Sequence, residues 1–214
     1  MSVQTTARAT ALVIALGIAA TGATASERSW NFRVTLDDRE IGQHRFTLST
    51  RESGERELRS EARFDVRVLF IDAFRYRHEA RERWQGDCLR ALEARTDTNG
   101  TVESVQARTQ GGRLAVEAGS RRETHEGCVM SFAYWNPRML EARQLLNSQT
   151  GELLPVRVTR LGEEPIEAGG RVVNAQRHRI EAPKLSIDLW YAGDQWLALE
   201  SPAAGGRRLR YRLH

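Results

Sequence analysis

Residues 57–84 read ELRSEARFDVRVLFIDAFRYRHEARERW, and the alternation in this stretch decides the fold class. Its even-numbered positions, among them Leu58, Ala62 and Phe64, are mostly apolar, whereas its odd-numbered positions are mostly Arg, Glu or Asp. A period of two residues is typical of a strand with one buried and one solvated face. The stretch therefore predicts two antiparallel strands that form a hairpin, with a turn near residues 71–73.

The charges on the solvated face predict the register of this hairpin. Opposite charges directly across a strand pair stabilise it by roughly 0.2–1 kcal/mol, and like charges oppose the pairing. The register that best pairs opposite charges places Asp65 opposite Arg77, Arg63 opposite Glu79, and Glu61 opposite Arg81. On the inner face it places Phe64 beside His78, Ser60 beside Glu82, and Leu58 beside Trp84.

Similar alternation, separated by turn residues, recurs along most of the chain. Asn99-Gly100 is the strongest hairpin signal, and Pro137 predicts the start of a short helix over residues 137–144. About ten strands in one antiparallel meander would expose too much edge as a flat sheet, so we expect a half-barrel or barrel. The further predicted strands cover residues 30–36, 44–48, 89–96, 101–109, 154–160, 171–181, 184–191, 196–200 and 208–213.

Length and composition indicate one ordinary globular domain. The chain has 214 residues, of which 40% are hydrophobic, and its 32 Lys and Arg against 28 Asp and Glu give a net charge of +4. These values exclude a disordered or collagen-like chain. The basic residues are interleaved with acidic ones, whereas a nucleic-acid-binding protein clusters them on one face. We therefore expect no nucleic-acid partner.

The N-terminal residues read as an export signal. Arg8 precedes an apolar run over residues 9–20, and Ala23-Thr24-Ala25 fits a small-residue cleavage site. Cleavage after Ala25 would leave a single β-rich domain over residues 26–214 in the periplasm. An uncleaved membrane anchor is the alternative, although the apolar run is too short to span a bilayer. We expect no transmembrane segment in the mature chain.

The chain has two cysteines, Cys88 and Cys128. An even pair in an exported protein predicts a disulfide, which would close a loop of about 40 residues and stabilise the fold. A redox or nucleophilic role would need closer spacing or a paired base, and the sequence shows neither. The predicted bridge is therefore structural.

Several polar residues fall on the face that should be dry. Buried polar groups need partners, so three interpretations stay open: core histidines bonded to neighbours, a polar patch in a ligand cavity, or a metal site. No hydrolase elbow, phosphate loop or metalloprotease helix is present, and we expect no cofactor. The polar residues at inward positions are His44, His78, His178, Glu82, Asn174 and Gln176.

Residues 128–151, CVMSFAYWNPRMLEARQLLNSQTG, form the most unusual stretch. They concentrate aromatic side chains and methionines beside Asn and Gln amides. One interpretation is a structural plug that packs against the open side of the sheet and is tied to it by the disulfide. The other is a lid over a site for an apolar or amphiphilic ligand.

Several segments resemble a known family. RFDVRVLFIDAFRYRHEARERWQGDCL (63–89), SFAYWNP (131–137), LLNSQTGE (145–152) and IDLWYAGDQWLALES (187–201) are similar to exported proteobacterial proteins defined by a domain of unknown function. VNAQRHRIE (173–181) and RLRYRL (208–213) add a similarity to a broader family of periplasmic β-proteins. A more distant resemblance is to the curved sheet of the lipoprotein carriers LolA and LolB. The resemblance implies an exported β-rich fold and transfers no catalytic residues.

These observations together predict a periplasmic protein that binds or carries a small hydrophobic or amphiphilic molecule without catalysis. Two alternatives stay open: an envelope assembly module that docks a protein partner through the aromatic stretch, and an enzyme using His78 or His178 as a general base. The predicted ligand contacts are Trp84, Tyr134, Trp135 and Trp190, with His78, Glu82 and Asn136 as orienting groups.

Overall fold

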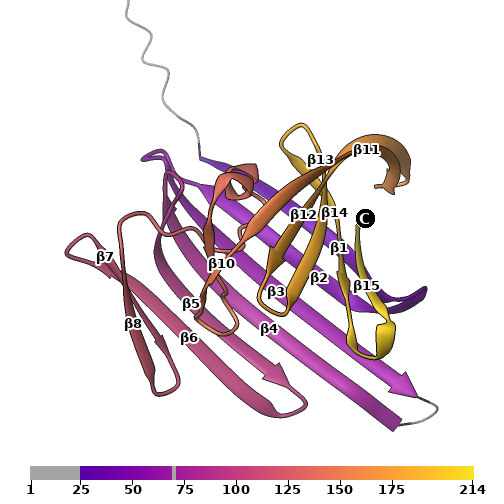
Figure 1. The fold of residues 1–214 in the computed structure, drawn as a ribbon, viewed down its shortest axis with the longest axis horizontal. Helices are drawn as coiled ribbons and strands as arrows, with labels where there is room; N and C mark the ends of the chain where they lie inside the picture. Colours follow the sequence, from indigo (N-terminus) through magenta and orange to yellow (C-terminus); the bar gives the residue numbers. More distant parts are fainter. Residues whose placement is uncertain (1–24, 69–70) are drawn as a thin grey trace, which may run out of the picture.

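The computed structural model describes residues 25–68 and 71–214, and these residues form mainly antiparallel β-structure (Figure 1). The predicted signal peptide, apart from Ala25, lies outside the described residues. The strands of the first half are β1 (Ser26–Leu36), β2 (Arg39–Thr50), β3 (Glu55–Val68), β4 (Ile71–Gln85), β5 (Cys88–Thr98), β6 (Thr101–Gln110), β7 (Arg113–Ala118) and β8 (Arg121–Glu126). Those of the second half are β9 (Gln144–Leu146), β10 (Leu153–Pro155), β11 (Arg157–Ala168), β12 (Arg171–Ala182), β13 (Leu185–Ala192), β14 (Gln195–Pro202) and β15 (Arg208–Leu213).

Thirteen of the described strands form one sheet, and β9 and β10 form a separate two-stranded sheet. The large sheet consists of two meanders, β1–β8 and β11–β15, which join where β1 pairs with β15. Its edges within the described residues are β8 and β11. The mainly β fold class and the antiparallel meander are confirmed, but the sheet is open rather than a closed barrel.

The predicted turn and register of the first hairpin are both wrong. β4 begins at Ile71, so residues 71–73 belong to a strand, and the connection falls on residues 69–70, outside the described part. Glu61 lies opposite Glu79, and Arg63 lies opposite Arg77. In both pairs the partner on β4 is two residues away from the one that the charge-matched register predicts.

The reason for this register is visible on both faces of the hairpin. On the inner face Phe64 stacks on Tyr76, with ring centroids 5.2 Å apart. On the outer face the guanidinium of Arg77 reaches diagonally to both carboxylate oxygens of Asp65, each at 2.9 Å. Because arginine is long enough to pair diagonally, opposite charges need not face each other directly. The stacking of Phe64 on Tyr76 and the ion pair of Arg77 with Asp65 therefore form together, although Arg77 lies two residues along β4 from the position directly opposite Asp65.

The alternation itself is confirmed. On β1 the side chains of Trp30, Phe32 and Val34 are buried, and on β3 those of Leu58 and Phe64 are buried. These side chains belong to the main hydrophobic core, which covers one face of β1–β7 and continues onto β12–β15. The predicted helix over residues 137–144 is a shorter 3-10 helix, η1 (Pro137–Glu141).

The C-terminal meander has a second, smaller core on its other face. It contains Trp190, Leu197 and Ala198, with Ala168 and Ala175 from β11 and β12. The amide of Gly169, just after β11, donates a hydrogen bond to the carbonyl of Leu213 in β15. Strands β11–β15 therefore curl far enough to cover this core themselves.

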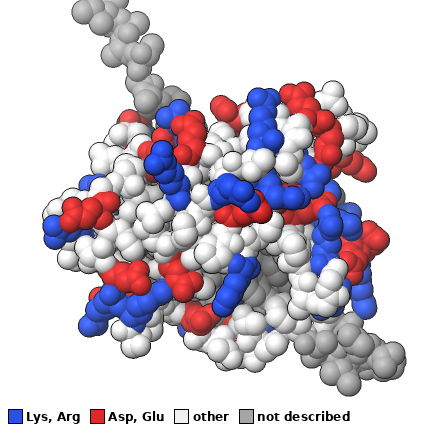
Figure 2. Space-filling view, in the orientation of Figure 1, with Lys and Arg blue, Asp and Glu red and all other residues white. Residues whose placement is uncertain are grey.

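Charged residues of both signs are interspersed over the face shown in Figure 2. The Arg side chains pair with nearby acidic groups on the strands, as Arg157 does with Glu181 and Arg113 with Glu126. Such exposed pairs each contribute roughly 0–1 kcal/mol. Among the described residues no helix is long and apolar enough to cross a membrane.

Candidate functional site

Residues 128–151, here called the aromatic segment, lie against the inner face of the sheet. Between the edge strands β8 and β11 the chain crosses this face, and the buried side chains of Val129, Trp135, Met139 and Leu146 join the main core. The segment also pairs with itself, because Ser131 bridges to Leu146. The location expected of a plug or lid is therefore observed.

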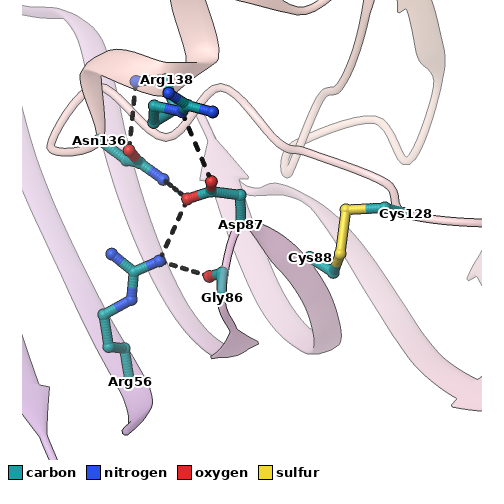
Figure 3. The surroundings of a disulfide bond; sticks show 7 residues. All are labelled: Arg56, Gly86, Asp87, Cys88, Cys128, Asn136 and Arg138. Atoms are coloured by element: carbon teal, nitrogen blue, oxygen red, sulfur yellow. Dashed lines mark hydrogen bonds and ion pairs between the residues drawn. A yellow bond between two sulfur atoms is a disulfide. The ribbon is translucent and has the colours of Figure 1, made fainter.

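The start of the segment is fixed to the turn between β4 and β5 (Figure 3). Cys88 and Cys128 form the predicted disulfide, and the amide of Leu89 donates to the carbonyl of Val129 at 2.9 Å. Asp87, in that turn, accepts a hydrogen bond from the Asn136 side chain at 2.9 Å. Arg56 and Arg138 flank the same Asp87 carboxylate, at 3.4 and 3.7 Å.

The segment also contacts strands of both meanders. The hydroxyl of Tyr191 on β13 donates to the carbonyl of Tyr134 at 2.7 Å. At the other end Gly151 lies so close to β6 and β7 that an added Cβ would stand 3.0 Å from the Cβ of Ala118. The segment thus joins the two meanders across the inner face.

A cavity of about 110 Å³ remains between the aromatic segment and the sheet. Strands β2, β3, β4 and β13 form one side of it, and the segment forms the other. Its lining combines aromatic and aliphatic carbon with a few polar groups, which is the composition of a small-molecule site. The lining residues are His44, Phe46, Leu58, Ser60, His78, Ala80, Glu82, Phe132, Tyr134, Trp135, Asn147, Ser148, Gln149, Leu185 and Ile187.

Both histidines of the cavity have hydroxyl partners. His44 Nε2 lies 2.7 Å from Ser60 Oγ, and His78 Nδ1 lies 2.9 Å from Thr96 Oγ1. Burial, assisted by the neighbouring His78, holds the pKa of His44 well below its ordinary value of 6.5. Burial alone lowers the pKa of His78 to about 4. At neutral pH both imidazoles are therefore uncharged.

Glu82 is the one carboxyl group in the lining described above. Its side chain accepts hydrogen bonds from Trp84 Nε1 at 3.0 Å and from Ser131 Oγ at 3.2 Å. Burial raises the pKa of Glu82 to about 7, although both hydrogen bonds act in the opposite direction. Because Ser131 belongs to the aromatic segment and Glu82 to β4, this contact also holds the segment on the sheet.

Trp135, which lines the cavity, has an unsatisfied buried donor. Its side chain is only 4% exposed, and Nε1 is buried without a hydrogen-bond partner among the described residues. One face of the indole is covered by the Arg56 guanidinium, which lies 4.6 Å from the ring centroid. Buried donors are nearly always hydrogen-bonded, so this nitrogen is an exception in the core.

The structure brings together four of the seven predicted ligand contacts, because His78, Glu82, Tyr134 and Trp135 all line the cavity. Trp84 lies directly behind them: it is fully buried, and its ring meets that of Trp135 edge-on at 5.6 Å. Trp84 therefore supports the site from outside the lining.

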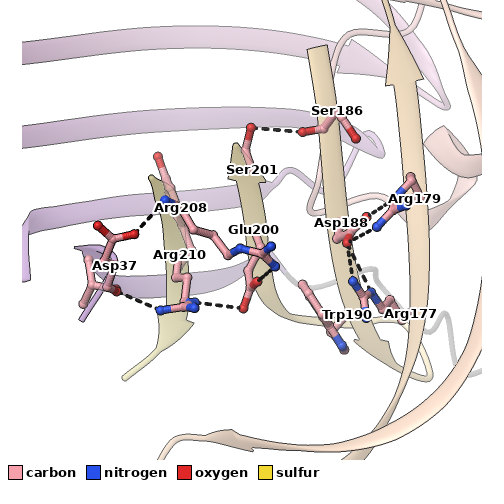
Figure 4. A network of polar contacts seen from close by, with 12 residues as sticks. Asp37, Arg177, Arg179, Ser186, Asp188, Trp190, Glu200, Ser201, Arg208 and Arg210 are labelled. Atoms are coloured by element: carbon pink, nitrogen blue, oxygen red, sulfur yellow. Dashed lines mark hydrogen bonds and ion pairs between the residues drawn. The ribbon is translucent and has the colours of Figure 1, made fainter. Parts of the chain in front are cut away.

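Asn136 and Trp190 do not join this group. Asn136 accepts from the Arg138 amide at the start of η1 and donates to Asp87, so its amide anchors the segment. Trp190 belongs to the second core, where its Nε1 donates to Glu164 at 2.7 Å. Figure 4 shows Trp190 beside the ion pair of Arg177 and Asp188.

Of the other inward polar residues, only His44 reaches the cavity. Asn174 is exposed, so its predicted burial is wrong: it has the inward parity of β12 but lies where nothing covers that face. Gln176 and His178 are partly buried on the same strand, and Gln176 accepts from Arg160 at 2.5 Å. Among the described residues no group of three or more His, Cys, Asp or Glu could hold a metal ion.

Sequence reasoning missed several lining residues. Ser60 and His44 carry the signal of inward parity, but nothing in the sequence shows that they are paired. Phe132 and the amides of Asn147 and Gln149 belong to a segment whose path across the sheet cannot be read from periodicity. Their side chains become neighbours of β2–β4 only through tertiary packing.

Three larger hollows lie elsewhere among the described residues, and the smallest of them, of about 350 Å³, lies at the junction of β4 and β5 beside Trp84. Of the other two, one of about 790 Å³ lies near the end of β15, and the second, of about 480 Å³, lies over the outer face of β3–β6. The second is lined largely by Arg and Glu side chains, and two of them, Arg59 and Arg81, pair with Glu57 just outside the lining. None of the three combines several aromatic walls with buried ionisable groups, so the cavity under the aromatic segment is the candidate site.

Comparison with curated proteins and with solved structures finds no significant match. A family model, described as a domain of unknown function (DUF6134), matches residues 32–214. That range includes almost all of the described sheet, the aromatic segment and every residue of the cavity lining. The chain therefore belongs to the DUF6134 family.

Proposed function

We propose that this protein is exported to the periplasm and binds a small hydrophobic or amphiphilic molecule there without changing it chemically. The observation that carries the proposal is the mixed lining of the cavity, in which the aromatic segment and the sheet enclose uncharged histidines and one carboxyl group. Aromatic area with a few orienting polar groups suits an amphiphile.

Two features support export. The first strand begins at Ser26, the residue that would follow the predicted cleavage after Ala25. The bridge between Cys88 and Cys128 suits an oxidising compartment such as the periplasm, because cytosolic thiols are kept reduced.

In this proposal the open sheet acts as a half-barrel, and the aromatic segment acts as its lid. The cavity of about 110 Å³ is smaller than the roughly 300–1,000 Å³ of sites for drug-sized ligands. It is closer to the roughly 150 Å³ that holds a single benzene molecule. The ligand is therefore small, or it places only one end under the segment.

The alternatives are less well supported. A docking module would present the aromatic side chains to a partner, but Trp135 is buried and Tyr134 packs on Trp196 at 5.2 Å. For an enzyme with a histidine base, His178 lies outside the cavity lining, and His78 already bonds to the buried Thr96.

The proposal is tested by native mass spectrometry of protein exported to a bacterial periplasm and purified without detergent. We expect an extra mass on the native protein that disappears on denaturation. Ala80→Leu, which fills the cavity, should remove this mass, whereas the same change at the half-exposed Ala115 on β7 should not. Trp135→Ala and His78→Ala should weaken the binding of the identified ligand. An unmodified native mass for the wild type, or equal occupancy in Ala80→Leu, would contradict the proposal.

A further inference from the structure

The two edges of the large sheet differ in how well they are protected against pairing with another strand. β11 contains Pro165, which has no amide to donate, and its pairing is interrupted by a bulge between Arg160 and Gly162. Proline and bulges are typical means of blocking a sheet edge. β8, the other edge within the described residues, is a regular strand over Arg121–Glu126 without proline, glycine or lysine. The edge at β8 is therefore open to another strand.

The backbone groups on the free side of β8 follow from the hairpin that it forms with β7. Gly119 and Ser120 make a two-residue turn, so Ala118 and Arg121, which flank this turn, exchange hydrogen bonds. Along an antiparallel pair, residues that exchange hydrogen bonds alternate with residues that do not. Every second residue after Arg121 therefore directs its amide and carbonyl away from β7. These residues are Arg122, Thr124 and Glu126.

The side chains of these residues are complementary to those of a second copy of the same strand. Arg122 and Glu126 are largely exposed, at 79% and 77%, and the uncharged Thr124 lies between them. When two copies of β8 pair antiparallel about Thr124, Arg122 of each copy faces Glu126 of the other. Other registers that pair the outward backbone groups place Arg122 and Glu126 opposite uncharged residues or opposite like charges. The register about Thr124 is therefore favoured by charge.

The ion pairs within each hairpin extend this charge pattern. Arg122 lies opposite Glu117 of β7, with 3.3 Å between their charged groups, and Glu126 lies opposite Arg113, at 2.8 Å. Pairing of two copies therefore forms rows that run from Glu117 and Arg122 of one copy to Glu126 and Arg113 of the second. Neighbours in each row have opposite charges. A strand of another protein with charges of one sign would instead meet a like charge at Arg122 or at Glu126.

We propose that two copies of this protein pair through β8 and form a dimer in which one sheet continues across the two-fold axis. The axis passes beside Thr124, and the outward backbone groups of the two strands bond to each other. Each copy contributes one short strand, and small interfaces of this kind are typical of weak, reversible association. The inference goes beyond the proposed function and does not depend on it, because none of the described lining residues of the cavity belongs to β8.

Charge reversal at β8 tests the dimer, with sedimentation velocity of the exported, disulfide-bonded protein as the measurement. We expect wild type to dimerise reversibly at concentrations of about 10–100 μM. Arg122→Glu and Glu126→Arg each place like charges opposite each other on both sides of the axis, so each variant alone should dimerise at least about tenfold more weakly. A mixture of the two variants pairs opposite charges again, and should recover most of the lost affinity as a mixed dimer.

Two further variants separate the free edge from the rest of the hairpin. Arg113→Glu is the matched control, because it reverses the partner of Glu126 within the same hairpin but lies on β7, one strand away from the edge. It should change the dimer affinity by less than about threefold. Thr124→Pro removes an outward amide at the centre of the pairing without changing any charge, and should also give monomers.

Wild-type protein that stays monomeric over this range of concentration overturns the inference. A dimer of unchanged affinity in Arg122→Glu or in Thr124→Pro overturns β8 as the interface. If the mixed variants do not associate, the register about Thr124 is wrong. None of these outcomes changes the ligand mass expected in native mass spectrometry, so the proposed function stands or fails separately.

Discussion

Glu82 is a carboxylic acid buried in the core. It lies in the core, with donors from Trp84 on its own strand and from Ser131 on the aromatic segment. Burial penalises the carboxylate more than these two hydrogen bonds stabilise it, so the neutral acid is favoured up to about pH 7. The protonation of this one group therefore affects both the stability of the fold and the contact between sheet and segment.

Replacing Glu82 with Gln should change the pH dependence of stability. Because the pKa of Glu82 rises from 4.5 in the unfolded chain to about 7 in the fold, its contribution is complete below pH 4.5 and is lost as the pH rises through 7. Gln cannot ionise, so between about pH 4.5 and 8 the variant should gain on the order of 3 kcal/mol in unfolding free energy relative to wild type.

Urea unfolding of both proteins at several pH values measures this difference in unfolding free energy. His78 has the opposite pH dependence, but it is present in both proteins, so its contribution cancels when the two are compared. The pKa of His78 falls to about 4, so its own contribution is complete above pH 6.5 and is lost as the pH falls through 4 in both proteins. Stability curves that run parallel for wild type and Glu82→Gln would show that Glu82 is not desolvated.

Gly42 has the tightest backbone environment of the described glycines. It lies beside a bulge where Val34 pairs with Gly42 but the next residue, Thr35, pairs with Glu40. Its φ is +150°, and an added Cβ would stand 1.9 Å from the carbonyl oxygen of Arg63. Gly42→Ala should therefore lower the unfolding free energy by about 3 kcal/mol or more.

Gly86→Ala is the matched control, since Gly86 also has a positive φ but has open space around its Cα. It should lose only about 1–2 kcal/mol, the cost of the left-handed conformation. Equal losses at the two positions, measured by urea unfolding, would show that the contact with Arg63 is not what requires glycine at Gly42.

At the level of elements, alternation predicted most of the strands because each half-buried strand carries its own pattern. The Asn99-Gly100 hairpin follows from local turn chemistry and was also predicted. The register of β3 and β4 was not, because Phe64 packs on Tyr76 while Arg77 reaches Asp65 diagonally. A register predicted only from charges that face each other directly takes no account of aromatic packing on the other face or of diagonal ion pairs made by long side chains.

We expect the disulfide, which anchors the aromatic segment to the sheet, to contribute measurably to the free energy of unfolding. Cys88 and Cys128 are 40 residues apart, so chain entropy gives the bridge an upper value of about 4 kcal/mol. Replacing both with Ala should lower the unfolding free energy by about 2–4 kcal/mol in chemical unfolding of the oxidised wild type and the variant. A difference below about 0.5 kcal/mol would mean that the hydrogen bonds of Asp87 and Asn136 suffice to hold the segment.

For the whole molecule, the sequence indicated an antiparallel sheet that must curve but could not give its strand order. β15 pairs with β1, so the last strand closes the gap between two meanders that are distant in the chain. The path of the aromatic segment across the inner face depends on contacts such as that of Tyr134 with Tyr191. These are tertiary contacts without a local sequence signature, which is why only four of the seven predicted ligand residues line the cavity.

The central claim is that the space between the sheet and the aromatic segment is a ligand site. The most direct measurement is the electron density in a crystal structure of protein exported to a periplasm and purified without detergent. We predict density for a small organic molecule that lies among Phe132, Tyr134 and Trp135. Ordered water alone in this cavity, or a ligand bound at another surface, would contradict the account.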